Sequence, residues 1–97
     1  GFTEVYRAGC LAPFVEGSPV QLACSYIESQ TLAVNQTVLL IASIDQVFLD
    51  EKGLREDGTL DLNALGTLAV SGLDEYHSGQ SLGRLSYAKP GILPTEL

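Results

Sequence analysis

The chain lacks methionine altogether: none of its 97 residues is a methionine, and position 1 is glycine. We therefore expect a cleaved, trimmed or otherwise partial polypeptide. Long hydrophobic runs are missing as well. The longest, from Val38 to Ile44, is far shorter than the roughly 20 residues of a membrane-spanning helix, and no charged and apolar leader opens the chain. These absences predict a soluble protein without a membrane partner, and we expect it in the cytoplasm.

Basic residues are scarce. Five lysines and arginines stand against 12 aspartates and glutamates, which gives a formal net charge of −7. A surface with this charge repels the phosphate backbone of nucleic acids and anionic lipid headgroups. We therefore expect no nucleic acid partner.

Cysteines are few too. Cys10 and Cys24 form no CxxC motif, no histidine is near them in the sequence, and the composition is not disulfide-dense. This favours two separate thiols in a reducing compartment. A less favoured interpretation is a secreted domain closed by a Cys10–Cys24 disulfide and glycosylated at the sequon that begins at Asn35.

What the sequence does contain suffices for one small domain, since 45% of its residues are hydrophobic. We expect a mainly β fold with one short helix. Within residues 1–97, we expect residues 1–17 to form a loop or short edge strand, residues 18–90 to hold the core strands and a turn motif, and residues 91–97 to form a tail.

Period-two patterns predict the first strands. A half-buried strand begins after Ser18 and ends at a polar break over residues 28–30; its alternating members are Val20, Leu22, Cys24 and Tyr26. After a turn near Asn35, residues 36–50 are apolar and rich in β-branched side chains. They predict a strand of about 12 residues, in which Ser43 and Asp45 are places for a bend or bulge.

The second half contains shorter elements. Residues 50–65 predict a charged, hairpin-like segment with turns at two glycines, Gly53 and Gly58. Asp61 is placed to cap a short helix over residues 62–66, and residues 81–90 alternate like another strand. Three or four strands with apolar faces do not close a barrel, so we expect that polypeptide outside these 97 residues supplies further strands.

Four segments of the chain, in their order and spacing, resemble the C-terminal half of the flavin reductase-like, FMN-binding split-barrel proteins, the group of flavin reductase and flavoredoxin. They are EGSPVQLACSYIES, TVLLIASIDQVFLD, REDGTLDLNALGTLAVSGLDEYHSG and RLSYAKP. The resemblance implies a six-stranded Greek-key barrel that binds FMN noncovalently, as a homodimer with the flavin near the subunit interface. It also implies that the N-terminal half supplies most contacts to the cofactor's phosphate and ring.

The resemblance assigns five cofactor-binding residues to this chain: Ser71, Gly72, Tyr76, His77 and Arg84. Gly72 would let the backbone approach a ligand, and Tyr76 would pack against the flavin ring. Ser71 and His77 would donate hydrogen bonds to flavin or nicotinamide, and Arg84 would be a charge partner. The residues alone leave other roles open: a plain turn for Gly72, core packing for Tyr76, an uninvolved loop histidine, and a strand-pairing charge for Arg84.

The function implied is electron transfer between NADH or NADPH and FMN. No catalytic side chain and no metal are needed, because hydride transfer to a flavin is the cofactor's own chemistry. The alternative is a small acidic β-domain that serves as a binding or structural module without cofactor. That alternative is supported by the absence of a self-contained phosphate-binding motif such as GxGxxG.

Overall fold

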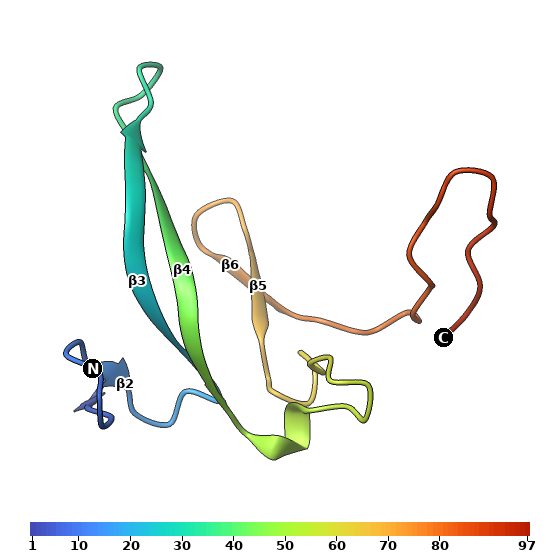
Figure 1. Cartoon of the computed structure of the whole chain (residues 1–97), viewed down its shortest axis with the longest axis horizontal. Coiled ribbons are helices and arrows are strands. Elements are labelled where there is room, and N and C mark those ends of the chain that lie inside the picture. The colour runs from blue at the N-terminus through green and yellow to red at the C-terminus, as the bar shows by residue number, and fades with distance from the viewer. The chain divides into compact units, whose positions relative to one another are not determined.

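The computed structural model describes all residues, 1–97, and is mainly β, as expected (Figure 1). The chain divides into two compact units, Gly1–Glu51 and Lys52–Leu97. Its strands form three separate two-stranded sheets, each antiparallel. No closed barrel is present in these strands, which agrees with the expectation drawn from their number. No helix is both long enough and apolar enough to cross a bilayer.

The first unit contains two sheets. In the lead-in segment, β1 (Glu4–Val5) pairs with β2 (Phe14–Val15), which confirms short strands there. The long hairpin consists of β3 (Val20–Thr31) and β4 (Val38–Leu49), each of 12 residues. The polar break predicted over residues 28–30 is wrong, because this part of β3 is paired to the apolar start of β4 and the backbone pairing does not depend on polar side chains.

Two bulges interrupt the long hairpin. Ala23 faces Gln46 while Cys24 faces Ile44, so that Asp45 is an extra residue on β4. The Asp45 carboxylate accepts hydrogen bonds from the hydroxyls of Ser25 and Ser43. The bulge predicted at Asp45 is therefore confirmed.

Ser43, the other predicted bulge site, is paired in register with Ser25. A second register shift, between Tyr26 and Glu28, leaves Ile27 as the extra residue on β3. The bulge at Ile27 was not predicted, because an apolar β-branched residue in a strand carries no bulge signal.

The buried face of β3 is the opposite of the predicted one. Gln21 is 7% exposed, whereas Leu22 is 47% exposed. The lead-in segment covers the Gln21 face: Arg7 Nε donates to Gln21 Oε1 at 2.7 Å, and Gln21 Nε2 donates to the Val15 carbonyl at 2.7 Å. The Arg7 guanidinium also lies 4.2 Å from the centroid of the Phe48 ring. A polar residue is thus buried with its hydrogen bonds satisfied.

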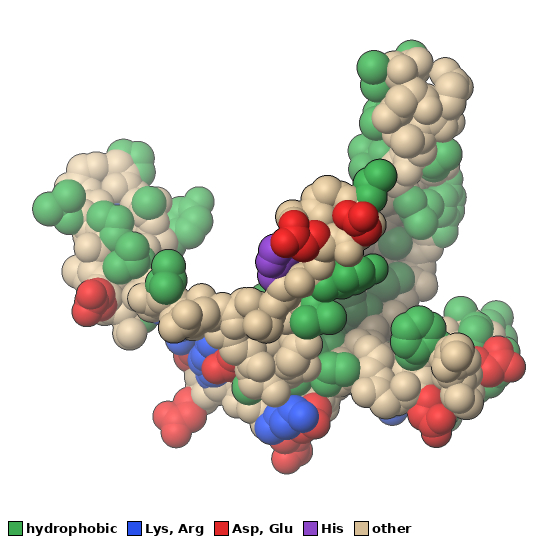
Figure 2. All heavy atoms as spheres, turned by 180° about the vertical axis from the view of Figure 1, so that it is seen from behind, with side chains coloured by type: hydrophobic (Ala, Val, Ile, Leu, Met, Phe, Trp, Pro, Cys, Tyr) green, Lys and Arg blue, Asp and Glu red, His purple; other side chains and the backbone are tan.

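Apolar surface is abundant on the strands. Leu65, at 4% exposure, is the one buried hydrophobic residue of the chain. Figure 2 shows hydrophobic side chains along the length of the β3–β4 hairpin. Its exposed large apolar residues include Leu22, Tyr26, Leu40, Ile44 and Val47. Burial of such side chains is the main source of folding free energy, so this chain by itself has little of it.

A 3₁₀ turn, η1 (Glu51–Gly53), begins at the last residue of the first unit and precedes a bridge between Leu54 and Leu60 in the second. Gly58 has a φ of 82° at the predicted turn. The hairpin-like segment is therefore confirmed. The sheet of this unit consists of β5 (Leu68–Ser71) and β6 (Glu75–Ser78).

Two predictions in the second unit are wrong. Residues 62–66 form a turn and not a helix, because Gly66, with a φ of 69°, ends it after one turn. Residues 81–90 form no strand: isolated bridges join Leu85 to Glu96 and Lys89 to Ile92, so the segment 91–97 folds back on residues 84–89. Alternation in a sequence produces a strand only where a neighbouring strand satisfies its backbone groups.

Candidate functional site

The 70–80 stretch is a β-hairpin. β5 and β6 pair from Leu68 with Ser78 up to Ser71 with Glu75, and residues 72–74 form the turn. Gly72 has a φ of 59°, and a Cβ atom at this position would meet no heavy atom within 4 Å. Its role in the turn is thus conformational, since a residue with a Cβ is strained at this φ, and there is open space above it.

Strand alternation divides the predicted residues between two faces. Because side chains point alternately to the two sides of a sheet, Ser71, Glu75 and His77 share one face, whereas Tyr76 lies on the other face opposite Val70. Four of the five predicted site residues therefore belong to one hairpin, but Tyr76 and His77 do not point to the same side of it.

The polar face of the β5–β6 hairpin carries a hydrogen-bonded group. Ser71 Oγ lies 2.8 Å from His77 Nε2 and donates to Glu75 Oε2 at 3.3 Å when its proton points that way. All three side chains are exposed, and Figure 2 shows the histidine next to acidic side chains. A hydroxyl, a carboxylate and an imidazole in contact can donate to and accept from a ligand.

The apolar face presents an aromatic ring. Tyr76 is 67% exposed and is paired across the sheet with Val70. The ring is therefore not buried in a core formed by this chain. An exposed phenol ring beside an aliphatic neighbour is suited to packing against a planar ligand or another apolar surface.

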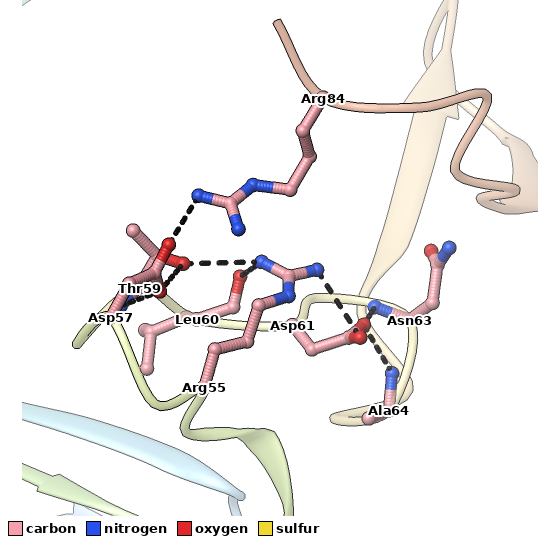
Figure 3. A network of polar contacts seen from close by, with 8 residues as sticks. All are labelled: Arg55, Asp57, Thr59, Leu60, Asp61, Asn63, Ala64 and Arg84. Carbon is pink, nitrogen blue, oxygen red and sulfur yellow. Dashed lines mark hydrogen bonds and ion pairs between the residues drawn. The ribbon is translucent and has the colours of Figure 1, made fainter. Parts of the chain in front are cut away.

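Arg84 is held elsewhere. Its Nη2 lies 2.6 Å from Asp57 Oδ2, and the Thr59 hydroxyl donates to Asp57 Oδ1 at 2.6 Å (Figure 3). These contacts hold the pKa of the Asp57 carboxyl far below its usual range, with the Thr59 hydrogen bond as the largest cause and the Arg84 hydrogen bond next. Arg84 therefore takes part in an ion pair with Asp57 and does not belong to the hydrogen-bonded group of the β5–β6 hairpin.

A second arginine completes the same network. Arg55 Nη1 donates to the Leu60 carbonyl at 2.7 Å, and Arg55 Nη2 lies 3.2 Å from Asp61 Oδ2 (Figure 3). Asp61 Oδ1 accepts from the backbone amides of Asn63 and Ala64, both at 3.0 Å, so the predicted capping role of Asp61 is confirmed although no helix follows. The pKa of Asp61 is lowered, chiefly by the Ala64 amide.

The residues of this chain fit one part of a flavin better than another. The polar face of the hairpin offers hydrogen-bonding groups that suit the edge of an isoalloxazine ring, and the opposite face offers an aromatic ring that suits its plane, so a given flavin ring can contact one face or the other. A phosphate needs cations or several free amides. Both arginines of the second unit are already paired with aspartates, so neither guanidinium is free to bind a phosphate.

The two cysteines do not form a disulfide: Cys10 and Cys24 are free. Cys10 Sγ contacts Gln46 Oε1 at 3.7 Å, and Gln46 is the partner of Ala23 on one face of the long hairpin. Cys24, the next residue, points to the opposite face. The interpretation as a domain closed by a Cys10–Cys24 disulfide is therefore wrong for this structure.

The chain is similar to a solved structure. It matches the crystal structure of a candidate flavin reductase with a split-barrel domain from Shewanella frigidimarina NCIMB 400, with a TM-score of 0.84 and 40% sequence identity over 90% of this chain. This match supports the resemblance to the flavin reductase-like split-barrel proteins. The resemblance and the fold class inferred from sequence are thereby confirmed. No family model matches the chain. No curated protein matches it either.

The chain spans less than half of that split-barrel protein, since the match covers 44% of the Shewanella chain. This coverage agrees with the expectation that the chain corresponds to about half of a split-barrel domain. In such a protein, the exposed strands of this chain have more polypeptide to pack against than the 97 residues themselves provide.

Sequence reasoning did not assign Glu75 to the site. A three-residue turn at 72–74 places Glu75 directly opposite Ser71, and the glycine turn signal at Gly72 is the sequence feature from which this pairing could have been inferred.

Proposed function

We propose that the complete protein is an FMN-binding flavin reductase that takes electrons from NADH or NADPH, and that this chain forms the C-terminal half of its barrel. The proposal is supported by one observation above all: 40% identity to a candidate flavin reductase over 90% of the chain. We further propose a cytoplasmic homodimer in which the N-terminal half supplies the phosphate contacts.

Bound FMN would supply the redox chemistry, because its ring accepts a hydride and releases electrons. The residues of this chain would position and shield that ring. On one face of the hairpin, Ser71 and His77 would form hydrogen bonds to the edge of a flavin or to the nicotinamide. On the opposite face, Tyr76 would pack against the plane of a flavin ring, and Gly72 would keep the turn open to a close approach. Arg84 would act indirectly, since its partner is Asp57.

The experiment is FMN retention by the complete protein. The purified protein is loaded with FMN, desalted, and scored for flavin absorbance and for oxidation of NADH and NADPH with and without added FMN. We expect retained flavin and FMN-dependent oxidation of at least one nicotinamide. A complete protein that keeps no flavin and oxidises neither nicotinamide would refute the proposal.

The second candidate function is a binding or structural module without cofactor. The ion pairs of the second unit favour it, because they leave neither of its arginines free to bind a phosphate. FMN-dependent oxidation of NADH by the complete protein would exclude it.

A further inference from the structure

One hydroxyl on the β5–β6 hairpin is shared by two neighbours. Ser71 Oγ lies 2.8 Å from His77 Nε2, the distance of a short hydrogen bond, and 3.3 Å from Glu75 Oε2, that of a longer one. The three side chains belong to one face and are exposed to a ligand from the same side. They form the Ser71–Glu75–His77 group.

The donors and acceptors of this group do not balance when His77 is neutral. An ionised carboxylate only accepts, a serine hydroxyl has one proton to donate, and a neutral imidazole has one donor and one acceptor nitrogen. If Nε2 is the acceptor nitrogen, the single Ser71 proton faces two acceptors. One of them then has no protein donor, and the group can take one further N–H from a ligand.

We propose that the Ser71–Glu75–His77 group is a subsite for an amide or imide N–H, with the Glu75 carboxylate as the acceptor. The proposal rests on the proposed function. Two molecules of that reaction carry such a group: the pyrimidine edge of the flavin has an imide N–H, and the nicotinamide has a carboxamide. A hydrogen bond to an ionised acceptor is about twice as strong as one between neutral groups, which gives Glu75 the larger share of the binding.

The test measures two constants of the complete protein at pH 8: the Kd of FMN, from quenching of its fluorescence, and the KM of NADH or NADPH. Glu75→Gln should weaken one of them about tenfold, as expected for the loss of a charge-assisted hydrogen bond. A change in the Kd of FMN identifies the flavin imide as the ligand, and a change in KM alone identifies the carboxamide.

Asp74→Asn is the matched control, because it removes the same charge one residue away from Glu75 and its side chain is outside the group. It should leave both constants within about twofold of the wild type, well below the tenfold effect of one lost hydrogen bond. Melting temperatures of all variants show whether the fold is kept. A folded Glu75→Gln protein with both constants unchanged would overturn the proposal.

Failure of the function itself gives a different result from failure of the subsite. A wild-type protein without FMN retention or nicotinamide oxidation ends both proposals, whereas an active protein in which Glu75→Gln changes neither constant ends the subsite alone.

Discussion

The two principal hairpins differ in what they present. The β3–β4 hairpin has strands of 12 residues, two bulges and an apolar face that nothing in its own unit covers. The β5–β6 hairpin has strands of four residues, no bulge, and a polar face with hydrogen-bonded side chains. Long apolar strands gain free energy when they are covered, whereas short polar ones gain little. The first hairpin is thus suited to assembly and the second to presenting functional groups.

The largest effect is expected from a charge on the apolar face of the long hairpin. In the complete protein, Leu22→Asp would bury a carboxylate without a partner and should lower the free energy of unfolding by more than about 3 kcal/mol. In the 97-residue chain, where Leu22 is 47% exposed, the same change should have little effect. Thermal melting and soluble yield of both proteins measure the difference. Equal effects in the two would mean that the face stays uncovered.

The next largest effect concerns binding by the short hairpin. In the complete protein, Tyr76→Ala should weaken FMN binding about tenfold by removing aromatic contact with the ring, and should lower the melting temperature only slightly. Tyr76→Phe is the control, because it keeps the ring and removes only the hydroxyl. If Tyr76→Ala loses stability while FMN affinity is unchanged, the residue packs in a core and does not contact the flavin.

A smaller effect tests the turn of the same hairpin. Gly72→Ala should cost about 1 kcal/mol of stability, because an alanine is strained at the φ of 59° even though no neighbour would clash with its side chain. Gly72→Asn should cost less, since asparagine tolerates this conformation better. Chemical denaturation of both variants gives the comparison. A larger loss for asparagine than for alanine would point to a close approach that requires the absence of any side chain.

The smallest effect belongs to the network outside both hairpins. The pKa of Asp57 is lower in the folded state than in the unfolded state, so its contribution to stability is present above about pH 4 and is lost as the pH falls further. Asp57→Asn should remove this part of the acid dependence and leave the stability near pH 7 slightly reduced, because the group is exposed and screened by water. Denaturation midpoints between about pH 2.5 and pH 7, taken with and without salt, test the expectation; an acid profile unchanged by Asp57→Asn would contradict it.

Local signals predicted the features that depend on neighbouring residues. Period-two alternation located β3 and β4, a turn residue located the Asp57–Gly58 turn, and a polar residue within an apolar run located the bulge at Asp45. Features that depend on distant partners were missed. The strand predicted at residues 81–90 lacks a neighbouring strand in this chain, and the buried face of β3 depends on Arg7.

The candidate site shows the same division. Residues 70–80 contain the chain's one histidine and a glycine-tyrosine motif, and the sequence alone was sufficient to select them. Cross-strand pairing then decided which side chains meet: it joined Ser71 to His77, added Glu75 and separated Tyr76 onto the other face. Arg84, outside the hairpin, is paired with Asp57 instead.

By itself, the sequence determined the resemblance to split-barrel proteins, the mainly β fold and the turns, because these follow from patterns of residues close together in the chain. The tertiary structure alone decided which face of β3 is buried, where the bulge at Ile27 lies, and which polar groups share the Ser71 proton. The physical reason is that burial and hydrogen bonding depend on which segments meet in space, and those segments need not be neighbours in the chain.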